Sequence, residues 1–229
     1  MSERILNIIE EAFGKIMIAG IKVTIPLTVI GFSLAMVIAL FMALAQYAKV
    51  PVLTQIARFY IWIFRGTPLL VQLYLAYFGL PKVGIVMDAF PCAVMVFALN
   101  EGAYCAETMR SSLESVSEGQ IEAGYCSGMN FFQIMWHVVL PQAFRTAFPP
   151  LSNSLISMLK DTSLAATITV ADMFMAAQRV VGRTYEPLVV YCEVALIYLL
   201  FSTVLTILQR YGEKRLGAYT SKEVKEAKA

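Results

Sequence analysis

Polar side chains interrupt one apolar stretch of this chain, residues 86–110, at helical spacing. Asn100, Tyr104 and Glu107 are separated by four and three residues, so an α-helix places all three on one face. Glu101 lies about 100° around the helix from that face. Ionisable groups in an apolar helix are costly and usually face a cavity or one another. We therefore predict that Asn100, Tyr104 and Glu107 border a polar pathway.

A second polar break, Lys160-Asp161, lies inside another apolar stretch, ~22 Å from its start at helical rise. In one interpretation these charges are structural, with Lys160 paired to Glu101 or Asp161 bonded to a neighbouring hydroxyl. In the other, Asp161 holds the amine of a zwitterion, whose carboxylate meets amide, hydroxyl or backbone donors near Asn100 and Tyr104. Both interpretations stay open, and Lys160 and Asp161 are both candidate pathway residues.

A third motif, Gly66-Thr67-Pro68, also falls inside an apolar stretch. Proline removes one backbone hydrogen bond and frees carbonyls to line a pathway. Thr67 and Gln72 then become candidates for facing that pathway. The alternative is a simple kink near the inner leaflet, with Arg65 extending to lipid phosphates.

Composition places these polar residues in a membrane protein. Hydrophobic residues make up 59% of the 229 residues and charged residues 15%, against roughly 45–50% and 25% in soluble proteins. Too little polar surface remains to cover a water-soluble body, so the expected fold class is an all-α integral membrane protein. A net charge of +2 is too small for a nucleic-acid footprint.

Nothing in the residue pattern supports catalysis by this chain. It has one histidine, His137, and no G-x-x-x-x-G-K-[ST] motif that would cradle a nucleotide. The four cysteines form no CxxC pair, which predicts neither a metal site nor a disulfide framework. We expect no cofactor and no metal in this chain, so any energy source belongs to another subunit.

Runs of about 20 apolar residues are long enough to cross a bilayer as helices. We predict five spans, at about 23–48, 59–80, 86–110, 146–169 and 187–209. No inverted repeat relates two halves of the chain, so a five-span unit is expected to build its pathway by dimerising. The domain boundaries predicted are an amphipathic interfacial helix at 1–17, a transmembrane domain at 18–212 and a charged cytoplasmic tail at 213–229.

The distribution of basic residues predicts an orientation. With the C-terminus inside, ten Lys and Arg lie in inner segments and six in outer segments. The positive-inside rule therefore predicts the N-terminus outside and the C-terminus inside. The outer segment 170–186 is expected to form a short amphipathic helix. The six outer residues are Arg4, Lys15, Lys22, Lys82, Arg179 and Arg183.

The inner segment 111–145 carries the signals of a short helix. Ser117, followed three residues later by Gln120, matches a capping box, and Gly128 stands where a left-handed residue would end the helix. Apolar anchors follow before Leu140-Pro141. Such a helix, held along the cytoplasmic surface, indicates a docking element; an ordinary loop packed on its own protein is the alternative. The anchors are Phe131, Phe132, Ile134 and Trp136.

The spacing in this segment resembles the EAA loop of ABC importer permeases. Glu122-Ala123-Gly124, three residues, Gly128, nine residues, Val138, one residue and Leu140-Pro141 follow the family pattern. The family usually has alanine at Gly124 and isoleucine at Val138, and a glycine within a helix costs roughly 1 kcal/mol against alanine. The resemblance implies that an ATPase subunit docks here, at Glu122, Ala123, Gly124, Gly128, Leu140 and Pro141.

The resemblance to permeases of polar-amino-acid importers covers roughly residues 20–210. The similar segments are 65–73, 100–110, 117–142 and 160–165. In related permeases, the positions of Tyr104 and Lys160-Asp161 border the amino-acid site. The residues around Phe59, 160–164 and 177–178 are most similar to the L-cystine permease branch.

This resemblance implies a type I ABC importer-like transmembrane domain in the bacterial cytoplasmic (inner) membrane. It would work in lipid as a homodimer, or as a heterodimer with a homologous permease. Two ATPase subunits would bind ATP and Mg, and a periplasmic or extracellular amino-acid-binding protein would deliver substrate. L-cystine is the expected substrate, with glutamine-, histidine- or arginine-type substrates as the alternative. In a different class, a self-contained ion-coupled carrier or channel would use Glu101, Glu107 and Lys160 as a relay.

Overall fold

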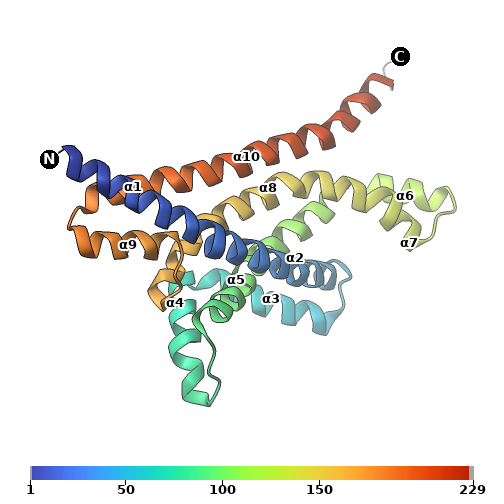
Figure 1. Ribbon diagram of the computed structural model, residues 1–229. Coiled ribbons are helices and arrows are strands. Elements are labelled where there is room, and N and C mark those ends of the chain that lie inside the picture. Colours follow the sequence, from blue (N-terminus) through green and yellow to red (C-terminus); the bar gives the residue numbers. More distant parts are fainter. Residues whose placement is uncertain (1, 227–229) are drawn as a thin grey trace.

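The computed structural model describes the backbone of residues 2–226 and the side chains of residues 3–216, and this part of the chain is helical with no strand. In chain order its elements are α1 (Ser2–Ala19), η1 (Gly20–Thr24), α2 (Ile25–Tyr47), α3 (Pro51–Gly66), α4 (Leu69–Tyr74), η2 (Leu75–Gly79), η3 (Leu80–Val83), α5 (Ala89–Glu114), α6 (Glu118–Cys126), α7 (Phe131–Ile134), η4 (Met135–Val139), α8 (Leu140–Asp161), η5 (Thr162–Ile168), α9 (Met173–Thr184) and α10 (Pro187–Glu226). The bundle is elongated, with α1 and α9 at one end and α6 and α7 at the other (Figure 1).

The first helix is continuous across the boundary predicted at residue 17. α1 passes through the π-helical turn η1 into α2, and Glu3–Tyr47 as a whole is long and apolar enough to cross a membrane. Ile8, Ala12 and Ile16, spaced by four, are buried with residues of α9 and α10. The apolar face of α1 is therefore used for packing on protein, and its place relative to the membrane surface stays a prediction.

A sharp break divides the second predicted span. α3 and α4 meet at 103°, and Thr67 between them is extended, with φ −123° and ψ 144°. The residue before a proline disfavours the helical region, so Pro68 sets the position of the break. Both helices that meet at the break, α3 and α4, contact α5.

α5 is the central helix and packs along α2. Ala35, Ala39 and Ala43 on α2 are fully buried, and their spacing places them on one stripe. A Cβ at Gly31 would lie 2.4 Å from Cε of Met158 on α8. Small residues thus let these helices approach closely, as is typical of membrane bundles.

Within the fourth predicted span, the type of helix changes at Asp161. The α-helix α8 gives way there to the 3₁₀ segment η5, which ends at a left-handed Thr169 with φ 69°. The short helix expected in 170–186 is present as α9. Asp172 caps it by accepting a hydrogen bond from the Met175 backbone N–H at 2.8 Å.

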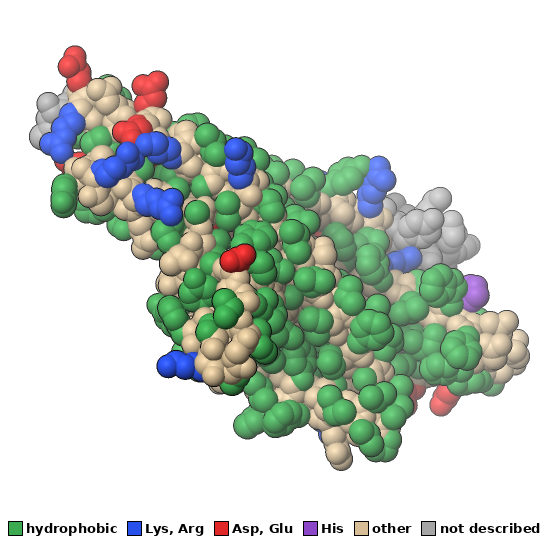
Figure 2. All heavy atoms as spheres, turned by 60° about the horizontal axis from the view of Figure 1, so that its bottom comes forward, with side chains coloured by type: hydrophobic (Ala, Val, Ile, Leu, Met, Phe, Trp, Pro, Cys, Tyr) green, Lys and Arg blue, Asp and Glu red, His purple; other side chains and the backbone are tan. Residues whose placement is uncertain are grey.

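The outer surface fits a membrane environment. Three helices of the described chain are long and apolar enough to span a membrane, and there are up to five spans if each of two bent pairs counts as one. Figure 2 shows hydrophobic side chains covering the body of the molecule, with Lys and Arg gathered at the end formed by α1 and α9. The predicted five spans correspond to the upper count.

The last helix extends well beyond the fifth predicted span. α10 continues to Glu226, through most of the segment assigned to a charged tail. Residues 227–229 of that predicted tail lie outside the described residues. The N-terminus lies at the end of the bundle opposite to α6 and α7 (Figure 1).

Candidate substrate pathway and coupling surface

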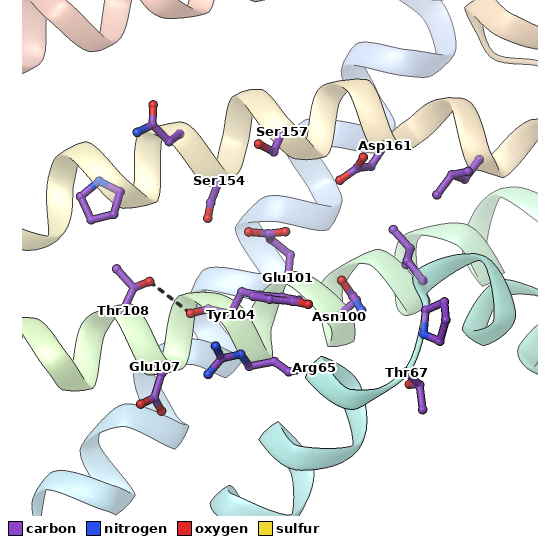
Figure 3. A pocket seen from close by; sticks show the side chains of 15 residues that line it. Arg65, Thr67, Asn100, Glu101, Tyr104, Glu107, Thr108, Ser154, Ser157 and Asp161 are labelled. Carbon is purple, nitrogen blue, oxygen red and sulfur yellow. Dashed lines mark hydrogen bonds between the residues drawn. The ribbon is translucent and has the colours of Figure 1, made fainter.

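A hollow of about 600 Å³ lies between the α3–α4 break, α5 and α8; it is called the central cavity below. Figure 3 shows α8 facing α5 across it, with the break on a third side. The structure brings together five of the seven predicted pathway residues at its walls, and their role in transport stays a prediction. They are Thr67, Asn100, Tyr104, Glu107 and Asp161.

The α8 wall presents hydroxyls and a carboxylate. Ser154, Ser157 and Asp161 are three and four residues apart and point toward α5 (Figure 3). Glu101 on α5 points toward Ser154 in the same view. Helical spacing predicted that Glu101 lies away from the face of α5 that borders the pathway. Glu101 nevertheless lines the cavity, because the cavity extends over more than one face of α5. Both serines were missed by sequence reasoning, although their spacing to Asp161 was a usable signal.

Arg65 was also missed as a cavity residue. Its guanidinium carbon lies 5.3 Å from the centroid of the Tyr104 ring, within the range of a cation–π contact. The structure places Arg65 at the cavity wall, and its reach toward lipid phosphates stays a prediction. With Asp161 on α8 and Glu101 on α5, the lining carries ionisable groups of both signs.

The break is held by two side-chain amides. Pro68 has no N–H, so the carbonyl of Phe64, four residues earlier, loses its helical donor. Gln72 Nε2 donates to that carbonyl at 2.9 Å and Asn100 Nδ2 donates to it at 3.2 Å. Gln72 Nε2 also donates to the hydroxyl of Thr67 at 2.8 Å, and Gln72 accepts from Asn100 at 3.0 Å. Gln72 is buried and does not line the cavity, so the expectation that it faces the pathway is wrong; it positions the wall.

Lys160 is exposed and lies outside the cavity lining. Within residues 3–216 no ion pair joins it to Glu101, so the structural interpretation that pairs these two is wrong. The same part of the chain contains no group of three or more His, Cys, Asp or Glu that could hold a metal ion.

Glu107 lies at the boundary between two polar hollows. Besides the central cavity it borders a second hollow of about 580 Å³, whose walls include Lys49 and Arg58. Arg110 holds Glu107 with two hydrogen bonds, one of them from Nε to Oε2 at 3.3 Å. Arg110 also donates to Glu114 at 2.5 Å. Glu107 is therefore engaged in an ion pair at the edge of the cavity.

The predicted docking helix is present as α6. Ser117 is its N-cap, but the serine side chain makes no capping hydrogen bond. Gln120 instead accepts from the side chain of Gln142 on α8, so the predicted capping box is wrong. A capping box does form at the next helix, α7, between Asn130 and Gln133. Gly128 has φ +80°, which confirms the left-handed residue predicted after α6.

The segment from α6 to η4 offers an exposed apolar surface, which we call the coupling surface (Tyr125, Phe131, Phe132 and Trp136). These four side chains are 50–81% exposed, and that a partner subunit covers them stays a prediction. Glu122 and Ala123 are exposed beside them, whereas Gly124 is buried against Ile134.

The coupling surface is anchored beneath by a small core. Ile134 and Val139 are buried with Leu113 and Val116 at the end of α5. Leu140 packs against this cluster, and Pro141 stands at the start of α8. The segment is thus a rigid projection from α5 and α8. The coupling roles of these residues stay predictions.

Comparison with known proteins assigns the chain to a family. The family described as "Binding-protein-dependent transport system inner membrane component" matches residues 35–218. The chain belongs to this family. It is a membrane-spanning permease subunit of the ABC importer type, as expected from the EAA-like segment. This identity makes it a transport component of a bacterial inner membrane.

Individual permeases agree with the family. The chain is 44% identical to the L-cystine transport system permease protein TcyB of Bacillus subtilis (strain 168), over 94% of this chain and 93% of that protein. It is 39% identical to the octopine transport system permease protein OccM of Rhizobium radiobacter, over 81% and 80%. The crystal structure of an amino acid ABC transporter with histidines matches with a TM-score of 0.79 and 34% identity, over 84% of this chain and 90% of that one.

Proposed function

We propose that this permease carries a polar amino acid, foremost L-cystine, through the central cavity. The observation that carries the proposal is the mixed charge of the cavity lining, with Asp161 on α8, Glu101 on α5 and Arg65 on α3. A zwitterionic amino acid has charges of both signs, two ammonium and two carboxylate groups in L-cystine, and so matches a lining with charges of both signs. The similarity to a permease named for L-cystine supports that substrate; glutamine-, histidine- or arginine-type substrates are the alternative.

The geometry supports one placement of the substrate. An ammonium group of the substrate lies at the α8 wall, where Asp161 supplies a carboxylate and two serines supply hydroxyls. A carboxylate of the substrate lies toward Arg65, which provides a charge-assisted hydrogen bond. Tyr104 carries a neutral hydroxyl between these walls, which favours a side chain without net charge over a cationic one.

The coupling surface supports docking to an ATPase subunit. Its exposed aromatic side chains fit an apolar groove of a partner, and Gly128 allows the chain to turn back beneath α6. Two ATPase subunits, one for each permease of a homodimer or heterodimer, would bind ATP and Mg. A periplasmic or extracellular amino-acid-binding protein would deliver substrate at the opposite end.

Alternating access follows from this arrangement. ATP binding closes the two ATPases, draws the coupling surfaces together and opens the pathway outward; hydrolysis resets it. The cavity residues bias the equilibrium only through their different contacts with substrate in the two states. The N-terminus lies at the end opposite to α6 and α7 (Figure 1), which supports an outer N-terminus and an inner C-terminus.

An ion-coupled carrier has less support. The relay expected for it needs Lys160 beside Glu101 and Glu107, and Lys160 lies outside the cavity. No observation favours this second class.

The test begins with affinity purification of the tagged chain from native membranes in mild detergent. A nucleotide-binding subunit should co-purify. In cells that express the chain, uptake of labelled cystine should be inhibited by unlabelled cystine more strongly than by glutamine or arginine. Uptake that survives ATP depletion but collapses with a protonophore would overturn the ATP-driven class. Stronger competition by arginine or glutamine would keep the class and change the substrate.

A further inference from the structure

A groove of about 720 Å³ between α1 and α9 gathers basic side chains above an apolar floor. Lys15 and Lys22 come from the first helix and Arg179 and Arg183 from α9. Spacings of seven and four residues put each pair on one face of its helix, so the two faces meet across the groove. The floor is formed by Ile18, Ala19, Val23, Ala171, Ala176 and Val180.

The protein neutralises only part of this positive charge. Glu11 accepts a hydrogen bond from Lys15 and another, at 2.9 Å, from Arg183. Within residues 3–216 neither Lys22 nor Arg179 has an ion-pair partner. The groove therefore offers two uncompensated cations to an external anion.

The position of the groove selects the kind of anion. Lys22 directly precedes the uncharged run 23–48, which places its ammonium where head groups meet the hydrocarbon layer. Further along the same helix Val29, Ile30 and Leu34 are 45–55% exposed and offer apolar surface to acyl chains. Basic pockets between membrane helices are a known mode of binding anionic head groups. A soluble acidic protein would engage the cations but leave the apolar surface uncovered.

The groove also accounts for an anomaly in the sequence. Four of the six basic residues assigned to outer segments line it, although such residues act against the positive-inside bias. Figure 2 shows the same concentration of Lys and Arg at the α1–α9 end. Binding of an anion in the groove would account for the grouping of these four basic residues.

We propose that the groove between α1 and α9 binds an anionic phospholipid, with the phosphodiester between Lys22 and Arg179 and the acyl chains along the apolar floor and α2. The lipid then bridges the first helix and α9, two elements far apart in sequence. The site is separate from the central cavity, with which it shares no lining residue. Only the leaflet depends on the proposed orientation, because the groove has the same chemistry on either side.

The test uses the delipidated, detergent-purified complex. It is titrated with dioleoylphosphatidylglycerol, with dioleoylphosphatidylcholine and with inorganic phosphate, while native mass spectrometry counts bound lipid and a thermal scan follows the unfolding midpoint. The expected result is saturable binding and a raised midpoint with the anionic lipid alone. Lys22→Gln combined with Arg179→Gln should weaken that binding about 30-fold, from the usual attraction of two cations to an anionic surface.

The matched control is Lys82→Gln. Lys82 is exposed, lies on the same predicted side and is not part of the groove, so lipid binding should be unchanged. Equal binding of both lipids, or equal losses in the control and in the double variant, would overturn the proposal. Saturation by inorganic phosphate would make the groove a site for a free anion and would reject the lipid. If the double variant lost attachment of the amino-acid-binding protein but kept lipid binding, the groove would be a protein docking site, which would also reject the lipid. None of these readouts requires transport, so failure here leaves the proposed function standing.

Discussion

The coupling surface and the central cavity of this permease are built in opposite ways. The coupling surface comes from one segment, residues 117–142, whose helix boundaries are set by nearby residues. The cavity is assembled from three segments, at 65–69, 100–108 and 150–164, whose polar groups meet only after the helices have packed. One region is exposed and apolar, the other recessed and polar. Changes in the first should therefore uncouple the permease without altering its substrate, and changes in the second should do the reverse.

The largest effect is expected for Gly128→Arg. Gly128 has φ +80°, and no heavy atom lies within 4 Å of a Cβ added there, so the substitution costs only the roughly 1–2 kcal/mol of a left-handed side chain. The added bulk and charge then lie beside α6, where the ATPase is proposed to dock. Uptake should fall to background while the protein stays in the membrane, and the ATPase should no longer co-purify.

Gly128→Asn provides the comparison, because asparagine tolerates the left-handed region better than other side chains. This variant should keep the ATPase and most of the transport. If Gly128→Arg also keeps both, docking does not occur at the end of α6, and the coupling surface must be placed elsewhere.

The next effect is expected for Asp161→Asn, which removes a charge from the cavity but keeps the shape of the side chain. A hydrogen bond to a charged group is worth about 1.5–3 kcal/mol, so transport efficiency should fall about 10–100-fold. ATPase attachment should be unchanged. Uptake kinetics measured in cells, and co-purification of the ATPase from the same cells, separate a defect in substrate binding from a loss of ATPase attachment.

Asp88→Asn is the matched control. Asp88 is exposed and makes no capping hydrogen bond with its side chain, so its uptake kinetics should equal those of the wild type. Unchanged kinetics in Asp161→Asn as well would reduce Asp161 to a structural residue and move the ammonium site to Glu101.

Features determined locally were predicted from the sequence. Apolar runs located the membrane helices, and the α9 helix and the left-handed Gly128 are where spacing and residue type placed them. The capping box at Ser117 failed because the side chain of Gln120 is bonded to Gln142, 22 residues away. A local rule was thus overridden by a tertiary contact.

The cavity was predicted only in part for the same reason. Helical spacing identified the polar face of α5, and Asp161 was singled out by its depth in an apolar run. The bonds that hold the α3–α4 break join Asn100 to Gln72 and to Phe64, 28 and 36 residues away. Spacing within one helix carries no information about such pairs, so Gln72 was assigned to the pathway and Arg65 was left out.

A moderate effect is expected for Gln72→Leu, which tests whether the break is held by amides. The substitution keeps the volume but leaves the carbonyl of Phe64 with fewer donors and Asn100 without one of its acceptors. A buried polar group without its partner costs about 1–3 kcal/mol. The thermal midpoint of the purified complex should fall, and KM should rise because Thr67 and Arg65 lose their fixed positions.

Gln178→Leu, an exposed glutamine on α9, controls for the loss of a polar side chain and should leave both quantities unchanged. A Gln72→Leu complex as stable as the wild type would mean that Pro68 alone holds the break.

The smallest effect is expected for Gly124→Ala, at the position where related permeases usually have alanine. A Cβ there would lie 2.9 Å from Cγ1 of Ile134, so Ile134 must shift, while alanine stabilises the helix by roughly 1 kcal/mol. The two contributions oppose each other, and the midpoint and the transport rate should stay near those of the wild type. In a double-mutant cycle with Ile134→Ala the free-energy changes should not add, because the new methyl group enters the space that the isoleucine vacates. Strict additivity would mean that α6 does not rest on Ile134, and the coupling surface would then be a loose loop instead of a rigid projection able to transmit movement of the ATPase to α8.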